Sequence, residues 1–290
     1  MRFQLHHGLA ADGVVGATTL AALAVPVERR IEQVLVNMER RRHLPTELGR
    51  RYVLVNVADF ELELLESEAD GSERSIFTSP VVIGTAYHQT PIFADEITHV
   101  IVNPYWHVPR SIVVDELLPE MRRDPEWLAR NRYTLWTTGE ATRRVDPATV
   151  DWSTMGRRSF PYLVRQEPGD HNALGRIKII FPNQFDVYMH DTPQKSLFGR
   201  ASRTFSHGCI RVGKPFELAA LLLAPRDISL DDLLAMKAGR ANRTIRLAEP
   251  VPVHITYFTA FVDEDGTAQF RADPYDRDRA VLEALSTGRS

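Results

Sequence analysis

The spacing of hydrophobic positions divides the chain into a short helical beginning and a longer β-rich remainder. Residues 27–42 carry apolar residues at helical spacing with charged residues between them, which predicts a helix that buries its apolar face. The apolar positions are Ile31, Val34, Leu35 and Met38. From residue 52 onward the hydrophobic period becomes two, which is typical of strands with one buried face.

Several segments fit this β pattern and are rich in β-branched and aromatic residues. They are residues 53–57, 62–64, 79–83, 98–102, 176–181, 186–189 and 251–262, with a turn at Ala58 and Asp59 between the first two. Residues 105–160 interrupt the pattern, and their length and tryptophan content favour an inserted lid or binding loop. A small separate core filled by those tryptophans is the alternative. Residues 214–236 predict two short helices, the first beginning with Pro215. The chain is therefore expected to have a β-rich α+β fold.

Composition narrows the possible partners. The chain has 290 residues and a net charge of −3, so no overall basic field attracts nucleic acid or an anionic membrane. No run approaches the roughly 18 apolar residues of a membrane span, and no secretory signal segment is visible. The single cysteine, Cys209, has no partner for an internal disulfide. A lone cysteine is most often a small buried apolar residue, so its neighbours decide whether it is reactive.

Cys209 lies in the most informative stretch of the sequence. Two histidines, His190 and His207, precede it, and Arg211 follows two positions later. An ordinary thiol is only a few per cent thiolate at neutral pH, so a nucleophilic cysteine needs a base or a cation beside it. His190 at a strand end is placed to be that base. Gly208 allows backbone N–H groups to approach a substrate carbonyl.

The same residues leave other interpretations open. His190 alone would more often be a hydrogen-bonded residue at a sheet edge than a base. His190, His207 and Cys209 are also possible metal ligands by residue type, but their spacing fits common zinc sites poorly. We therefore expect neither a metal nor another cofactor.

The spacing of His190 and the run from Ser206 to Arg211 resembles the signature of the L,D-transpeptidases. These are cysteine enzymes of the YkuD type that act on peptidoglycan. The resemblance extends to the long-form periplasmic members through residues 103–109, 150–152 and 190–193 and through the later leucine-rich helix.

The resemblance also implies how the chain is divided. An L,D-transpeptidase catalytic domain would occupy residues 51–270, with a mixed or sandwich-like sheet and a helical lid inserted at residues 105–160. Residues 1–25 resemble the second half of a small helical peptidoglycan-binding module, with an ordinary turn and helix as the alternative. Residues 26–50 would form a connecting helix, and residues 271–290 a C-terminal tail.

Site roles follow from the resemblance, position by position. Cys209 is expected to be the nucleophile, His190 the general base and His207 a second catalytic histidine. The main-chain carbonyl of Asp191 would fix the tautomer of His190, and Arg211 would hold a carboxylate of the substrate. The remaining candidates for substrate binding are Tyr188, Ser206, Gly208 and Trp106.

The implied reaction is the cross-linking of peptidoglycan. Cys209 would attack the carbonyl that joins diaminopimelate to the terminal D-Ala of a tetrapeptide stem, and a second stem's diaminopimelate amine would resolve the thioester. Water as the acceptor would make the protein an L,D-carboxypeptidase, and a non-catalytic cell-wall binding protein is a third interpretation. The family also implies stem peptides as partners, carbapenem β-lactams as inhibitors, and export to the periplasm with a signal segment absent from this chain.

Overall fold

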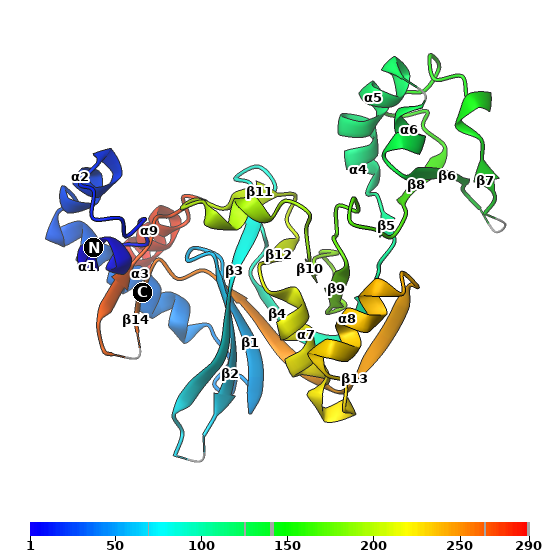
Figure 1. Cartoon of the computed structure of the whole chain (residues 1–290). Helices are drawn as coiled ribbons and strands as arrows, with labels where there is room; N and C mark the ends of the chain where they lie inside the picture. The colour runs from blue at the N-terminus through cyan, green and yellow to red at the C-terminus, as the bar shows by residue number, and fades with distance from the viewer. Residues whose placement is uncertain (69, 125, 140–141, 264, 289–290) are drawn as a thin grey trace.

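The computed structural model describes residues 1–68, 70–124, 126–139, 142–263 and 265–288. Three parts follow one another across the molecule (Figure 1). The N-terminal helices lie at one end beside the C-terminal segment, the main sheet lies in the middle, and an insertion stands away from the sheet at the other end. No helix within the described residues combines the length and hydropathy needed to cross a bilayer.

The middle part is a nine-stranded sheet with both parallel and antiparallel neighbours. Its strands are β1 (Arg51–Asn56), β2 (Glu61–Ser67), β3 (Glu73–Gly84), β4 (Phe93–Val102), β9 (Ile177–Ile180), β10 (Met189–His190), β11 (Thr204–Ser206), β12 (Ile210–Val212) and β13 (Arg243–Thr256). They are ordered β11-β3-β12-β10-β9-β4-β13-β1-β2, and β2 also pairs with β3. The expected mixed sheet is confirmed, and the pairing of β2 with β3 closes it on itself.

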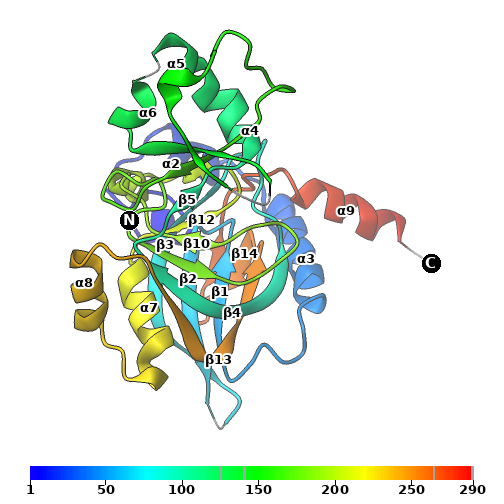
Figure 2. The ribbon, with the colours of Figure 1, turned by 90° about the vertical axis from the view of Figure 1, so that its right-hand side faces the viewer.

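Two helices cover this sheet, α7 (Pro215–Leu223) and α8 (Leu230–Ala238) (Figure 2). Both were expected, and α7 begins with Pro215, whose fixed φ suits the first helical turn. Ser229 caps α8 by accepting a hydrogen bond from the N–H of Asp232. The buried face of α7 joins the alternating valine, leucine and isoleucine side chains of the strands in one core. Short 3₁₀ turns occupy Lys195–Gly199 and Ala224–Arg226.

Two expected strands have different bounds. The strand expected over residues 186–189 is limited to Met189–His190, because Asp186 has a positive φ of 55° and ends the extended backbone before it. The segment 251–262 is divided into the end of β13 and β14 (Ala260–Val262). The break falls at residues 257–259, where the backbone of Phe258 bonds to the Asn56 side chain and that of Thr259 to the side chains of Gln33 and Asn37.

The insertion has its own sheet and its own core. Its elements are β5 (Trp106–His107), α4 (Arg110–Ile112), a π turn (Val113–Leu117), α5 (Leu118–Arg123), α6 (Trp127–Arg130), β6 (Tyr133–Thr137), β7 (Arg144–Val145), a 3₁₀ turn (Pro147–Thr149) and β8 (Tyr162–Gln166). The strands form a sheet in the order β5-β8-β6-β7. Trp152 and Phe160 are buried in a second hydrophobic cluster, with Trp106 and Trp127 packed against it. The helical insertion expected at about residues 105–160 thus also contains a sheet, and β8 extends it beyond residue 160.

The N-terminal helices pack against the end of the chain. They are α1 (Arg2–His6), α2 (Ala17–Leu23) and α3 (Val27–Arg42), and their partners are β14, β15 (Ala268–Phe270) and α9 (Asp278–Thr287). Residues 271–290, expected as a tail, thus include a helix that contacts α3. The two ends of the chain form one structural unit beside the main sheet (Figure 1).

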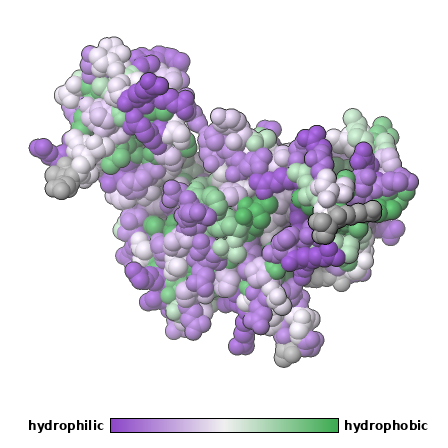
Figure 3. All heavy atoms as spheres, turned by 180° about the vertical axis from the view of Figure 1, so that it is seen from behind, coloured by the Kyte–Doolittle hydropathy of each residue, from purple (hydrophilic) through white to green (hydrophobic). Residues whose placement is uncertain are grey.

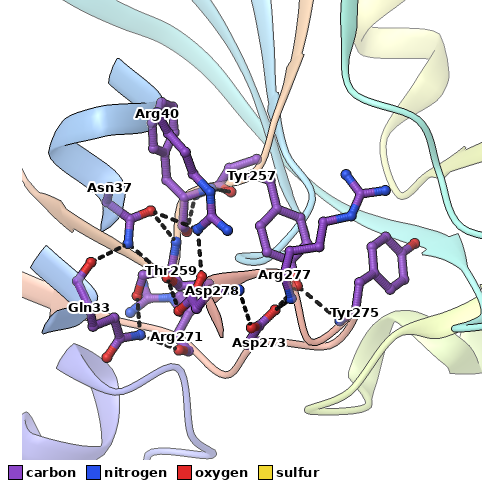
Figure 4. Close-up of polar contacts among 12 residues, drawn as sticks. Gln33, Asn37, Arg40, Tyr257, Thr259, Arg271, Asp273, Tyr275, Arg277 and Asp278 are labelled. Carbon is purple, nitrogen blue, oxygen red and sulfur yellow. Dashed lines mark hydrogen bonds and ion pairs between the residues drawn. The ribbon is translucent and has the colours of Figure 1, made fainter. Parts of the chain in front are cut away.

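Helix α3 has the predicted bounds, but it buries a polar face. Asn37 is 5% exposed, and its amide donates to Thr259 Oγ1 at 2.8 Å and accepts from the Thr259 N–H at 2.9 Å. One turn away, Gln33 donates to the carbonyls of Thr259 and Arg271 at 2.8 and 2.9 Å. Arg40 pairs with Asp278 at 2.6 Å. Figure 4 shows these side chains converging from α3 on the C-terminal segment.

The apolar face expected to be buried is instead exposed. Ile31 is 55% exposed and Leu35 is 48% exposed. Green hydrophobic surface is visible at the right-hand end of the molecule in Figure 3, where the N-terminal helices lie. The apolar spacing predicted the helix correctly but its orientation wrongly, because the backbone groups at residues 259 and 271 need polar partners that only the other face supplies.

This arrangement predicts that two substitutions on α3 will change the free energy of unfolding by very different amounts. Asn37→Ala leaves the N–H of Thr259 buried without its acceptor and should lower the free energy of unfolding by about 2–3 kcal/mol. Leu35→Ala on the exposed face should change it by less than about 0.5 kcal/mol. Urea unfolding followed by circular dichroism measures both. Equal losses would mean that the apolar face of α3 is covered in the folded protein.

Candidate active site

Three neighbouring strands place the candidate residues in a row. His190 on β10 lies opposite Lys178 on β9 and opposite Arg211 on β12. Residues that face each other across a sheet project to the same side, as do residues two apart on one strand. Cys209, two positions before Arg211, and Tyr188, two positions before His190, extend the row. The predicted site residues are therefore brought together by the register of β9, β10 and β12.

The turn before Cys209 is held from within. Ser206 is buried; its hydroxyl donates to the carbonyl of Cys209 at 2.5 Å and accepts from the N–H of Gly208 at 3.1 Å. Gly208 has a φ of 109°, which side chains other than glycine rarely adopt. Its carbonyl accepts a hydrogen bond from Thr90 at 2.9 Å. Ser206 and Gly208, expected to bind substrate, thus use these groups to shape the turn that presents Cys209.

Cys209 is half-buried and lies beside Tyr188. Its thiol faces the carbonyl of Asp186 at 3.8 Å, and the N–H and the phenol of Tyr188 approach the sulfur. Burial raises the pKa of the Cys209 thiol, while Tyr188 and the charge of Lys178 act in the opposite direction. Burial is the largest of these effects, so the pKa of the Cys209 thiol is raised and not lowered.

His190 is buried and has a fixed orientation. Its Nδ1 donates to the main-chain carbonyl of Asp191 at 2.5 Å, which leaves Nε2 as the acceptor. The Asp191 carboxylate is held by the N–H of Arg176 at 2.9 Å and by Lys195. The contact expected for the Asp191 carbonyl is thus present, and the Asp191 carboxylate is bound by groups of the chain itself. Burial, followed by the charges of Arg211 and Lys178, lowers the pKa of His190 to about 3.

A pocket of about 700 Å³ opens over this row. The main sheet and the loops that follow it contribute Lys178, Asp186, Tyr188, His190, His207, Cys209 and Arg211 to its lining, and the insertion contributes Trp106, Ile112, Glu116, Leu117 and Tyr133. The indole of Trp106 hydrogen bonds to the Tyr188 phenol, so the insertion contacts the group beside the thiol. The insertion therefore has a core of its own and also forms one wall of the site.

His207 contacts the insertion. Its Nε2 lies 2.6 Å from the Glu116 carboxylate, and its ring packs against that of His88 with 4.8 Å between centroids. The side chains of His207 and Glu116 are 40% and 50% exposed. His207 lines the pocket, but its Nε2 is directed to Glu116 of the insertion.

Sequence reasoning missed two charged residues of the pocket. Lys178 alternates with Ile177 and Ile179, so its strand pattern already placed it on the face opposite to the core. That pattern could not show which strand lies next to it. Glu116 carried no usable signal, because only the folded insertion brings it to His207. Among the described residues, no group of three or more histidine, cysteine or acidic side chains is arranged to hold a metal ion.

The direction of the pKa shift at Cys209 predicts how its reactivity depends on pH. Because burial raises the pKa of the Cys209 thiol, alkylation by iodoacetamide should keep accelerating to a higher pH in the folded protein than in the unfolded one. The urea-unfolded protein is the control, and its midpoint should be lower, near the value of about 8.5 for a free thiol. Mass spectrometry reports the rate at this single cysteine. A plateau already at pH 7 would reveal a preformed thiolate and contradict this expectation.

Comparison with known proteins places these residues in a family. Residues 50–253 match the YkuD L,D-transpeptidase catalytic domain. A Haemophilus influenzae protein, which its name places among the L,D-transpeptidases, is 32% identical over 250 residues. That alignment covers 86% of this chain and 49% of the relative, so the chain spans about half of the relative's length.

Solved structures give weaker similarities. An L,D-transpeptidase from Mycobacterium smegmatis matches with a TM-score of 0.32 and 12% identity, over 71% of this chain and 58% of that one. L,D-transpeptidase 3 from Mycobacterium tuberculosis, in complex with a faropenem-derived adduct, matches with a TM-score of 0.31 and 11% identity, over 71% and 60%. The domain match and the 32% identical relative show that the chain belongs to the YkuD family of L,D-transpeptidases.

Proposed function

We propose that the protein forms cross-links between two diaminopimelate residues of peptidoglycan through a thioester on Cys209. One observation carries the proposal. Cys209 and His190 line one pocket, and the hydrogen bond from His190 Nδ1 to Asp191 leaves Nε2 free to accept a proton. A half-buried thiol in the same pocket as a neutral, oriented imidazole suits acyl transfer by a cysteine nucleophile.

The reaction would proceed in two acyl transfers. His190 Nε2 takes the thiol proton as the sulfur attacks the carbonyl between diaminopimelate and D-Ala. The tetrahedral intermediate collapses to a thioester, and D-Ala leaves with the proton returned by His190. The side-chain amine of a second stem then attacks the thioester and gives its proton to His190. The new amide forms as the sulfur leaves and recovers that proton.

Water is the competing acceptor. It would hydrolyse the thioester and make the protein an L,D-carboxypeptidase. The wall formed by Trp106, Glu116 and Tyr133 favours transfer, because side chains of the insertion occupy space that water would otherwise fill. We therefore assign the insertion the role of a lid over the Cys209 pocket. A cell-wall binding protein without activity would have no need for a buried, oriented His190 beside the thiol.

The proposal extends to partners and location. The substrates would be stem peptides, and carbapenems would be the matching inhibitors, because their strained carbonyl offers the thiol an acyl group. L,D-transpeptidase 3 from Mycobacterium tuberculosis has been solved in complex with a faropenem-derived adduct. This chemistry belongs to the periplasm, so we propose that the native protein is exported. Residues 1–25 would then be part of a module that binds the same polymer.

Removal of the thiol tests the function. Purified protein incubated with disaccharide tetrapeptides should give a dimer whose mass and fragmentation show a diaminopimelate–diaminopimelate link. Cys209→Ala and Cys209→Ser should both abolish that product while circular dichroism shows an unchanged fold, since neither residue supplies a thiolate. Mass spectrometry of the products separates transfer from hydrolysis. A tripeptide alone would establish the carboxypeptidase, and turnover by Cys209→Ser would refute the nucleophile.

The two pocket histidines should differ in importance. His190→Ala removes the proton acceptor and should lower kcat by about 10²- to 10⁴-fold. His207→Ala removes the partly exposed contact with Glu116 and the packing against His88, and should cost about tenfold or less. The exposed His43 provides a matched control, since His43→Ala should leave kcat unchanged. If His207→Ala is the more damaging variant, the two roles have been exchanged.

A further inference from the structure

Lys178 has no role in the chemistry described above, yet it lies within the pocket. It is half-buried on β9, opposite His190, and its ammonium lies 3.5 Å from the centroid of the Tyr188 ring. Tyr188 in turn contacts Cys209. A lysine side chain can reach solvent from most positions, so a lysine kept over an aromatic ring beside the nucleophile indicates a local purpose.

Neither cation of the row has an acidic partner. In the described part of the chain, no carboxylate forms an ion pair with Lys178 or with Arg211, whose polar contact is Gln194 at 2.5 Å. The Nε of Arg211 is buried and has no hydrogen-bond partner among the described residues. Asp186 lines the same pocket and attracts Lys178 electrostatically. The other acidic residue of the lining, Glu116, is engaged by His207.

We propose that Lys178 binds a second carboxylate of the donor stem, so that Lys178 and Arg211 together select donors with two free carboxylates near the scissile bond. This inference rests on the proposed function. Strand spacing separates the two backbones by about 10 Å, which leaves room for two separate carboxylates above His190. Besides the α-carboxylate of its γ-linked D-Glu, the proposed donor carries two near the scissile bond, one on the D-centre of diaminopimelate and one on the terminal D-Ala.

Burial strengthens this preference for an anion. Partial dehydration lowers the pKa of the Lys178 ammonium, so a charged partner that replaces the lost water gains more here than at the surface. A carboxamide at the same position has no charge to offer. Amidation of the stem carboxylate that Lys178 binds should therefore weaken binding at this site.

Binding to the full chain carrying Cys209→Ala tests the proposal without turnover. The probes are the synthetic tetrapeptide L-Ala-γ-D-Glu-meso-diaminopimelate-D-Ala and two versions, one amidated at the diaminopimelate D-centre and one at the D-Ala terminus. Calorimetry gives Kd for each probe with Lys178, Lys178→Met and Lys178→Arg. Lys214→Met is the matched control, because Lys214 also lies over an aromatic ring but outside the pocket.

We expect Lys178→Met to weaken binding of the free tetrapeptide about tenfold, as for loss of one charge-assisted hydrogen bond. In the chains with Lys178 or Lys178→Arg, one of the two amidations should weaken binding by the same factor. In the Lys178→Met chain, that amidation should leave Kd unchanged. Lys214→Met should leave every Kd unchanged.

Other outcomes overturn the proposal. An equal loss for all three probes, or no loss, removes Lys178 as the partner of either carboxylate near the scissile bond. A different result would be unchanged Kd values together with slower iodoacetamide alkylation in a Lys178→Met chain that keeps Cys209. That result would assign the lysine to stabilisation of the thiolate. If no probe binds the Cys209→Ala chain, the proposed donor itself is wrong, a result distinct from binding that ignores Lys178.

Discussion

The register between β10 and the strands on either side of it is the constraint on which the site depends. Parallel pairing with β12 sets Arg211 opposite His190, and antiparallel pairing with β9 sets Lys178 on its other side. A shift of one residue in either pairing would turn these side chains into the core and expose Ile179 or Ile210. The buried apolar residues of the same strands therefore fix the geometry of the pocket. Catalytic placement and core stability are one property of this sheet.

The insertion depends on that sheet in a different way. Its β5-β8-β6-β7 sheet and its buried Trp152 give it a separate core, so its internal structure does not rely on the main sheet. Among the described residues, it contacts the pocket through Trp106, which approaches Tyr188, and through Glu116, which pairs with His207. The pair of His207 and Glu116 is partly exposed, and such a pair is weak and can break without unfolding either core. A wall joined in this way is suited to movement over a site.

The sequence allowed the fold class and part of the candidate site to be predicted. Hydrophobic periodicity located most strands and the bounds of α3, and the spacing of His190 and Cys209 pointed to two residues that line one pocket. The orientation of α3 was wrong, because Asn37 bonds to Thr259, a partner more than two hundred residues away. Lys178 and Glu116 were missed for the same reason. Local patterns show which face of an element is polar, whereas only the folded chain shows what that face contacts.

The charges around His190 bear on when the thiol can react. Proton transfer from Cys209 creates an imidazolium between two cations, and each adjacent unit charge opposes it by roughly 3 kcal/mol at an effective dielectric constant of about 20. A carboxylate bound beside each cation offsets that repulsion and makes His190 a stronger base. Under the proposed carboxylate-binding role of Lys178, the donor that fits the pocket thus also activates it. Burial itself favours the protonated form of the Cys209 thiol, and a protonated thiol is oxidised less readily than a thiolate.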